Sequence, residues 1–180
     1  LPISAKAATR SIPIVFETGA DPIQSGLVAS LNRPGGNVTG ITSLNAQVGP
    51  KRLELLHELL PSAGAFALLV KPDNKRNAEA TVELMQAAAA TLKVKLHLLQ
   101  ATSQEEFDGA FRKVRELGAG GLVIANDVYY ALRGEMLAGM AQRHGVPAAH
   151  QSREFVLAGG LIGYGGDVEE SHRQAGVYAG

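Results

Sequence analysis

The sequence contains no cysteine and no tryptophan, and aromatic residues make up only 5% of its 180 residues. The absence of cysteine excludes disulfides, thiolate catalysis and cysteine-ligated zinc sites. No apolar run approaches the roughly 20 residues that a membrane-spanning helix needs. Hydrophobic residues nevertheless form 46% of the chain, so we expect a core built from Ala, Leu, Val and Ile in one domain or slightly more.

The chain also lacks an excess of either charge, because 17 Lys and Arg are balanced by 17 Asp and Glu. A protein that binds the nucleic-acid backbone normally carries a basic excess or a basic stripe, and neither is visible. Dinucleotide, phosphate-loop and nucleophile-elbow motifs are missing as well. The five histidines have no metal-ligand spacing. We therefore expect no nucleic-acid partner, no cofactor, no metal site and no catalytic residues, so the protein is not expected to be an enzyme.

The beginning of the chain, Leu1-Pro2-Ile3-Ser4, has no initiator methionine and no signal-peptide pattern. We therefore interpret the sequence as an internal piece of a longer protein. Neither the cytosol nor an export compartment is excluded by these features.

From residue 65 onward, short apolar runs alternate with amphipathic stretches. This alternation predicts an α/β fold with a parallel sheet, helices on both faces and right-handed crossovers. Upstream of this region, four apolar residues at helical spacing predict a further helix between Pro22 and Leu31. The expected strands are 12–16, 38–41, 65–70, 94–99, 122–125, 147–150 and 161–164, and the expected helices are 22–31, 50–60, 77–92, 103–117, 130–144 and 153–157.

The apolar strand 122–125 is followed abruptly by Asn126 and Asp127. Asn and Asp are good helix N-caps, which is one interpretation of these residues. If the five later strands follow the flavodoxin-like order 2-1-3-4-5, however, the loops 71–77 and 126–130 flank the crevice where ligands bind in such sheets. The second interpretation is therefore ligand binding, and we favour it.

The loop 71–77 supports that interpretation, because it brings Asp73, Asn74 and Asn77 to the same predicted crevice. Two loops that lie far apart in the sequence thus supply amides and carboxylates to one place. His150, at the end of another expected strand, is a weaker candidate for the crevice.

The stretch Arg33-Pro34-Gly35-Gly36-Asn37-Val38-Thr39-Gly40 closely resembles the substrate-binding proteins of a family of bacterial ABC importers. A second stretch, Arg153-Glu154-Phe155 followed by Ala158-Gly159-Gly160-Leu161, occurs at the spacing seen in that family. The resemblance covers nearly the whole chain. Its other stretches are 12–16, 19–22, 26–28, 51–56, 58–61 and 164–165, together with Leu31, Pro72 and Asn74.

The resemblance implies a type I periplasmic-binding fold, in which two flavodoxin-like α/β lobes close on a small molecule and deliver it to an ABC permease in the membrane. Related proteins resemble amino-acid binders, including tryptophan-like aromatic ones, and are exported to the periplasm. On this model, residues 1–44 are the end of the first lobe and a hinge strand, 45–164 are the second lobe, and 165–180 begin the return segment. Such proteins are considerably longer than this chain.

The resemblance also implies a ligand site in the interlobe cleft, for a small amino-acid-like or carboxylate molecule. Hydroxyls and loop N–H groups would bind a ligand carboxylate, Asp127 an ammonium group, and Tyr129 or Phe155 an apolar body. The family positions that match are Asp21, Thr42, Ser43, Asn74, Asn126, Asp127 and Glu154.

Two other functions remain open at this stage. One is the ligand-sensing domain of a transcriptional regulator, which uses the same fold, and the other is a sugar- or nucleotide-handling enzyme on a flavodoxin-like sheet. Sequence upstream of Leu1 would separate a binder from a regulator. Because the strands 12–16 and 38–41 have no obvious further partner strands, a homodimer or a swapped assembly of this chain is also expected.

Overall fold

The computed structural model describes residues 2–73 and 75–180. The chain forms two compact units, of which unit 1 comprises Leu1–Ala46 and Gly166–Gly180, and unit 2 comprises Gln47–Gly165. In the part of the chain that the structure describes, no helix is long and apolar enough to cross a membrane.

Unit 2 is built on a five-stranded parallel sheet with the order β4-β3-β5-β6-β7. Counted from β3 as the first strand, this is the order 2-1-3-4-5, so the predicted fold class and winding are confirmed. The strands are β3 Ala65–Val70, β4 Lys95–Gln100, β5 Leu122–Ile124, β6 Ala148–His150 and β7 Ile162–Gly163. The helices are α2 Gly49–Leu59, α3 Lys75–Leu92, α4 Gln104–Glu116, α5 Val128–Ala131, α6 Gly134–His144 and α7 Arg153–Leu157.

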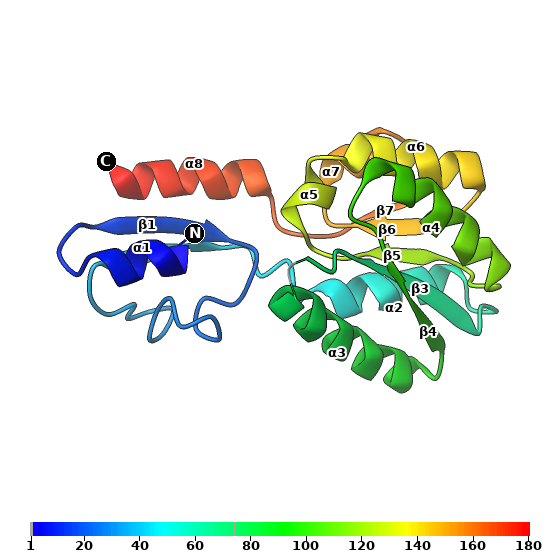
Figure 1. The fold of residues 1–180 in the computed structure, drawn as a ribbon, viewed down its shortest axis with the longest axis horizontal. Helices are drawn as coiled ribbons and strands as arrows, with labels where there is room; N and C mark the ends of the chain where they lie inside the picture. The colour runs from blue at the N-terminus through cyan, green and yellow to red at the C-terminus, as the bar shows by residue number, and fades with distance from the viewer. Residues whose placement is uncertain (1, 74) are drawn as a thin grey trace. The chain divides into compact units, whose positions relative to one another are not determined.

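Helices cover both faces of this sheet, with α2 and α3 on one face and α4 and α6 on the other (Figure 1). Successive side chains of a strand point to opposite faces. Leu69 and Ile124 therefore pack with α4 and α6, whereas Leu68 and Val123 pack with α2 and α3. All four side chains are fully buried. Burial on both faces explains why the central strands are continuous apolar runs.

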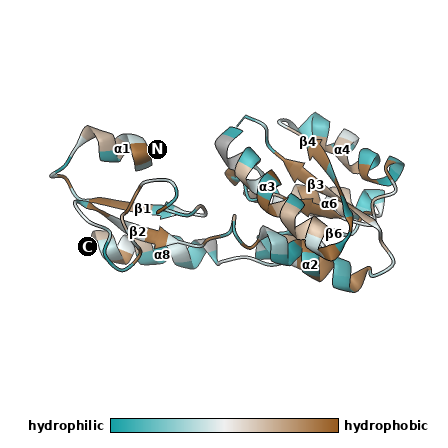
Figure 2. Cartoon of the chain, turned by 90° about the horizontal axis from the view of Figure 1, so that it is seen from below, coloured by the Kyte–Doolittle hydropathy of each residue, from teal (hydrophilic) through white to brown (hydrophobic). Residues whose placement is uncertain are grey.

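Unit 1 contains a two-stranded parallel sheet, β1 Ile14–Thr18 and β2 Val38–Thr42, in which Ile14 pairs with Val38. The helix α1 Pro2–Ala8 contacts β1, and α8 Val168–Ala179 contacts both strands. Figure 2 shows hydrophobic colour along β1 and β3, while much of α2 and α8 is hydrophilic. The buried cluster of unit 1 is small and consists of Phe16, Leu27, Val28 and Val38.

The helix predicted at residues 22–31 is wrong. The chain there makes turns, in which the Leu27 N–H donates to the carbonyl of Pro22, and Gly26 has a φ of 74°. This left-handed backbone is one that glycine adopts without cost and that a continuing helix cannot contain. As a result, Leu27 and Val28 are buried, but the other two residues of the predicted apolar stripe are exposed.

The helix predicted at 130–144 is divided in the structure into α5 and α6. Arg133, between them, has non-helical φ and ψ of −120° and 21°. Gly134 opens α6 at a close approach to the start of α7, where an added Cβ would lie 3.1 Å from Ser152 Oγ and 3.5 Å from Phe155 N. The interruption therefore follows from tertiary packing, which periodicity does not report.

The stretch Ser103-Gln104-Glu105-Glu106 at the start of α4 has the pattern of a capping box, in which the Ser103 side chain would accept a hydrogen bond from the backbone. The side chain of Ser103, the N-cap, makes no capping hydrogen bond. Instead, an Oε2 atom of Glu106 accepts hydrogen bonds from Thr102, at 2.5 Å from its N–H nitrogen and 3.0 Å from its hydroxyl oxygen. The carboxylate of Glu106 thus fastens the loop before the helix.

Candidate ligand-binding site

The carboxyl edge of the unit 2 sheet brings together the loops that follow β3, β4 and β5. Val70 pairs with Gln100 and Leu69 with Ile124, so the parallel strands end nearly level with one another. The residues that follow, including Lys71 and Asp127, therefore lie on the same side of the sheet. This is the position at which open α/β sheets bind ligands.

Asp127 caps the short helix α5. Its Oδ1 atom accepts a hydrogen bond from the Tyr129 N–H at 2.8 Å, which is the N-cap geometry that the sequence had left as one interpretation. Capping uses one carboxylate oxygen only. Among the described residues, no hydrogen-bond donor is directed to the other oxygen, so a capping role and a ligand-binding role are compatible.

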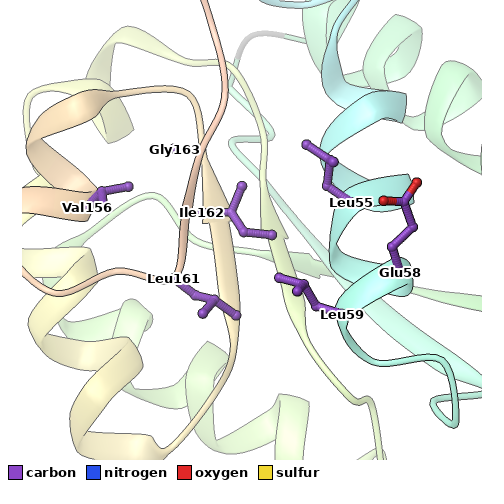
Figure 3. Close-up of a pocket in the computed structure, with 7 residues that line it drawn as sticks. All are labelled: Leu55, Glu58, Leu59, Val156, Leu161, Ile162 and Gly163. Carbon is purple, nitrogen blue, oxygen red and sulfur yellow. The ribbon is translucent and has the colours of Figure 1, made fainter.

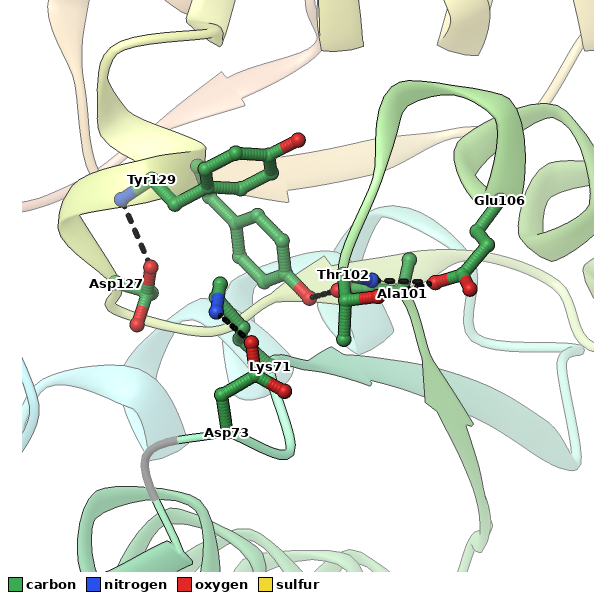
Figure 4. A network of polar contacts seen from close by, with 8 residues as sticks. Lys71, Asp73, Ala101, Thr102, Glu106, Asp127 and Tyr129 are labelled. Atoms are coloured by element: carbon green, nitrogen blue, oxygen red, sulfur yellow. Dashed lines mark hydrogen bonds and ion pairs between the residues drawn. The ribbon is translucent and has the colours of Figure 1, made fainter.

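Tyr129 is the aromatic centre of this edge, as Figure 4 shows. The guanidinium carbon of Arg133 lies 3.6 Å from the centroid of the Tyr129 ring, and Lys71 Nζ lies 5.6 Å from it. Both distances are those of cation–π contacts. The ring of Phe107 packs against Tyr129 at 6.0 Å between centroids. Tyr129 itself is only partly buried.

Lys71 forms an ion pair with Asp73 at the end of β3 (Figure 4). The hydrogen bond to Asp73 raises the pKa of Lys71, which is also within electrostatic reach of Asp127. Around the Tyr129 ring, two cations, Lys71 and Arg133, thus stand beside two carboxylates, Asp73 and Asp127. The predicted site residue Asn74 lies outside the described residues.

Tyr130 holds the loop after β5 in place. Its side chain is fully buried, and its hydroxyl donates to the carbonyl of Ala101 at 2.8 Å. Burial raises the pKa of Tyr130 well above its ordinary value, so the phenol stays protonated. The loop after β5 is therefore tied to the loop after β4 by a buried hydrogen bond, which fixes the direction of the neighbouring Tyr129.

Two of these residues, Lys71 and Arg133, were not assigned from the sequence. Lys71 lies inside the loop 71–77, in which only amides and carboxylates are predicted to contact a ligand. Arg133 carried a signal in its spacing, because it follows Tyr129 by four residues, a separation at which side chains on a helix are neighbours.

In unit 1, the predicted residues Asp21, Thr42 and Ser43 lie at the carboxyl edge of the β1–β2 sheet, where Thr18 pairs with Thr42. Asp21 Oδ1 accepts hydrogen bonds from the N–H groups of Ile23 at 2.8 Å and Gln24 at 3.2 Å. The Thr42 hydroxyl donates to the Ala20 carbonyl at 3.0 Å, and the Ser43 N–H donates to the Thr18 carbonyl at 3.1 Å.

The remaining candidates differ in their exposure. Asn126 is partly buried in the loop after β5, and Glu154 is exposed in the first turn of α7. Phe155 is fully buried and its ring packs against His150 at 5.3 Å, so it offers no face to a ligand. His150 is also fully buried, and burial lowers its pKa to about 3. Both are core residues, which corrects the suggestion that either faces the crevice.

A separate apolar groove of about 410 Å³ runs along α2 and β7 in unit 2 (Figure 3). Glu58 supplies its one charged side chain, and no predicted site residue lines it. The lining residues are Leu55, Glu58, Leu59, Val156, Leu161, Ile162 and Gly163. Within residues 2–73 and 75–180, no group of three or more His, Asp or Glu side chains is arranged to hold a metal ion.

Comparison with known proteins identifies a matching family and several similar proteins. The family model described as "ABC transporter substrate binding protein" matches residues 3–180. A crystal structure of a conserved domain protein from Vibrio cholerae has a TM-score of 0.80 and 26% sequence identity, and the match covers 99% of this chain and 59% of that one.

A crystal structure from Streptococcus pneumonia, described as an ABC domain in complex with L-Trp, has a TM-score of 0.76 and 22% identity, covering 99% of this chain and 60% of that one. A tyrosine-binding protein of Clostridioides difficile is 42% identical over 66 residues, which are 37% of this chain and 19% of that protein. The chain thus spans about 60% of the solved relatives' length.

Proposed function

Because the family model covers residues 3–180, the chain belongs to the ABC transporter substrate-binding proteins, and we propose that it binds a small amino-acid-like or carboxylate ligand for an ABC importer. That match is the observation on which the proposal chiefly depends. In this role the protein acts in the periplasm, presents its ligand to a membrane permease and catalyses no reaction.

The edge of the unit 2 sheet supports an amphoteric ligand. Lys71 and Arg133 balance Asp73 and Asp127 around one partly exposed aromatic ring. A zwitterion, with one ammonium and one carboxylate group, would find partners of both signs there without adding net charge. Asp127 is the proposed partner of the ammonium group, and the Tyr129 ring the proposed contact of the apolar body.

The other proposed ligand contacts are Asp21, Thr42, Ser43, Asn74, Asn126 and Glu154. In unit 1, Thr42 is the last residue of β2, and Asp21 and Ser43 follow β1 and β2. In unit 2, Asn126 follows β5 and Glu154 follows β6, so the described candidates all lie at or after the carboxyl ends of strands. Ligand sites in parallel sheets are built from such positions. The expectation that the ligand lies in a cleft between two lobes stays a prediction.

The similarity to a tyrosine-binding protein makes L-tyrosine the first ligand to test. Titration calorimetry on the full-length protein, with L-tyrosine, L-tryptophan and a panel of aliphatic amino acids and carboxylates, tests the proposal. We expect saturable binding of at least one of them with one site per chain. Absence of binding across the whole panel would contradict the proposed function.

A further inference from the structure

Arg133 differs from the other cation at the site in how its charge is used. Lys71 is already paired with Asp73. Arg133 is only half-buried, its Nη1 atom donates to the Tyr129 carbonyl at 3.1 Å, and its guanidinium stacks on the Tyr129 ring. Within the described part of the chain, no carboxylate lies within ion-pairing distance of it.

This arrangement fixes the plane of the guanidinium while committing only one of its five N–H groups. Stacking on an aromatic face and a hydrogen bond to a backbone carbonyl reduce the rotamer freedom that a long side chain otherwise loses on binding. The remaining N–H groups form a planar fork suited to two parallel hydrogen bonds with a carboxylate. The geometry is that of an anion receptor held in place before its anion arrives.

From this geometry we infer that Arg133 is a specificity-determining residue of the site, which binds the carboxylate of an amino-acid ligand whose ammonium group is bound by Asp127. The inference rests on the proposed function and adds a role that loop N–H groups and hydroxyls had been expected to fill. It predicts that the site distinguishes an amino acid from the amine that lacks its carboxylate.

The test compares L-tyrosine with tyramine, its decarboxylated analogue, by calorimetry on the full-length protein. A charge-assisted pair corresponds to about tenfold or more in affinity. Arg133→Met should therefore weaken L-tyrosine binding about tenfold or more and change tyramine binding by less than about threefold. If L-tyrosine is not the ligand, the amino acid that the panel identifies and its decarboxylated amine replace this pair.

Two further variants keep the result interpretable. Arg133→Lys keeps the charge but not the fork, so it should recover part of the lost affinity. Arg112→Met is a matched control. Arg112 is an exposed arginine of α4 that pairs with Asp108 at 2.8 Å, and it is not one of the proposed ligand contacts. It should leave both affinities unchanged.

The possible results test the role of Arg133 and the proposed function separately. Binding of amino acids by the unaltered protein with equal losses for amino acid and amine in Arg133→Met would overturn the role of Arg133 and leave the proposed function standing. The same holds if Arg133→Met binds the amino acid normally. No binding of any amino acid by the unaltered protein overturns the proposed function, and the role of Arg133 falls with it.

Discussion

Both units are built on a parallel sheet with buried apolar side chains, but unit 2 has more strands and larger buried clusters than unit 1. In unit 2, five strands lie between helices on both faces, and two clusters of buried side chains fill the two interfaces. In unit 1, two strands share a single cluster of four buried residues, with Ile14 packed at its margin. Both sheets are parallel, and both carry their candidate ligand residues at the carboxyl edge.

The candidate site residues of the two units are held in place by different kinds of contact. In unit 2, the loop after β5 is fixed by the buried Tyr130 and by its hydrogen bond to Ala101. In unit 1, Asp21 is held by N–H groups of its own turn, and the Thr42 hydroxyl donates to the Ala20 carbonyl in the loop after β1. A buried aromatic side chain orders the first set, and exposed or partly buried hydrogen bonds to the backbone order the second, so the two should respond differently to mutation.

The largest effect is expected in the core of unit 2. Phe66 is fully buried in β3 and makes an edge contact with His57 at 5.8 Å between ring centroids. Phe66→Ala should lower the free energy of unfolding by about 3–5 kcal/mol, because it removes buried apolar surface and leaves a cavity between layers that cannot collapse. Urea denaturation measures the loss.

Phe16→Ala is the matched substitution in unit 1, where Phe16 is 5% exposed in β1. With one small cluster to disrupt, it should reduce amide-exchange protection in β1 and β2 and leave β3 and β5 protected. Loss of protection in β3 and β5 equal to that in Phe66→Ala would show that the two units unfold as one, and that the contrast between them is not energetic.

The next effect concerns Asp127, the proposed ligand residue of unit 2. Asp127→Asn keeps an N-cap of similar quality but removes the charge. Affinity for an amino-acid ligand should fall by about 2 kcal/mol or more, since a charged hydrogen bond is lost and its partner is left unpaired. The urea midpoint should hardly change. Calorimetry and denaturation on the same samples therefore separate recognition from capping.

Asp127→Ala provides the complementary case, with the same loss of affinity and a further loss of stability of about 1 kcal/mol from the missing cap. The site assignment would have to be abandoned if Asp127→Asn bound the ligand as tightly as the unaltered protein. Asp21→Asn makes the same change in unit 1 and reports whether its carboxylate contributes charge to the ligand or only order to its turn.

Sequence reasoning reached the architecture of unit 2 because its signals are local. The apolar runs of β3 and β5 identify buried strands, and the alternation with helices indicates a parallel sheet, for which 2-1-3-4-5 is a common order. It failed at residues 22–31, where Leu27 and Val28 have helical spacing but Gly26 adopts positive φ. Leu27 and Val28 are buried without forming a helix, so helical spacing of apolar residues does not by itself establish one.

The sheet order predicted where the candidate residues lie in the fold, but not the contacts that Lys71 and Arg133 make there. Sheet order placed Asp127 at the carboxyl edge, because that follows from topology alone. Contact between the Tyr129 ring and Arg133 depends on the interruption between α5 and α6, which arises from the approach of Gly134 to α7. The spacing of four residues between Tyr129 and Arg133 was a local signal of this contact, whereas the interruption between the two helices is a tertiary property.

The small size of unit 1 also favours self-association of the 180-residue chain, which would depend on protein concentration. Among the described residues, neither edge of the β1–β2 sheet is paired with another strand, and Ile12 and Leu31 are 65% and 58% exposed. Open strand edges and exposed apolar side chains favour association. We expect a homodimer or a swapped assembly in light scattering. A stable monomer whose N-terminal segment resists proteases would contradict this prediction.

The smallest effect should be an acid dependence in α8 of unit 1. Glu170 accepts hydrogen bonds from Arg173 at 2.7 and 2.6 Å and from Gln174 at 2.8 Å. These contacts, with Arg173 the main cause, lower the pKa of Glu170 from 4.5 to about 2. A folded-state pKa below the unfolded value means that the stabilisation is complete above 4.5 and disappears as the pH falls toward 2. Glu170→Gln should therefore have a slightly lower urea midpoint than the unaltered protein at about pH 6, and most of this difference should be lost at about pH 2. A constant difference at both values would mean that the ion pair does not supply the stabilisation, and that helix geometry alone accounts for the effect of the substitution.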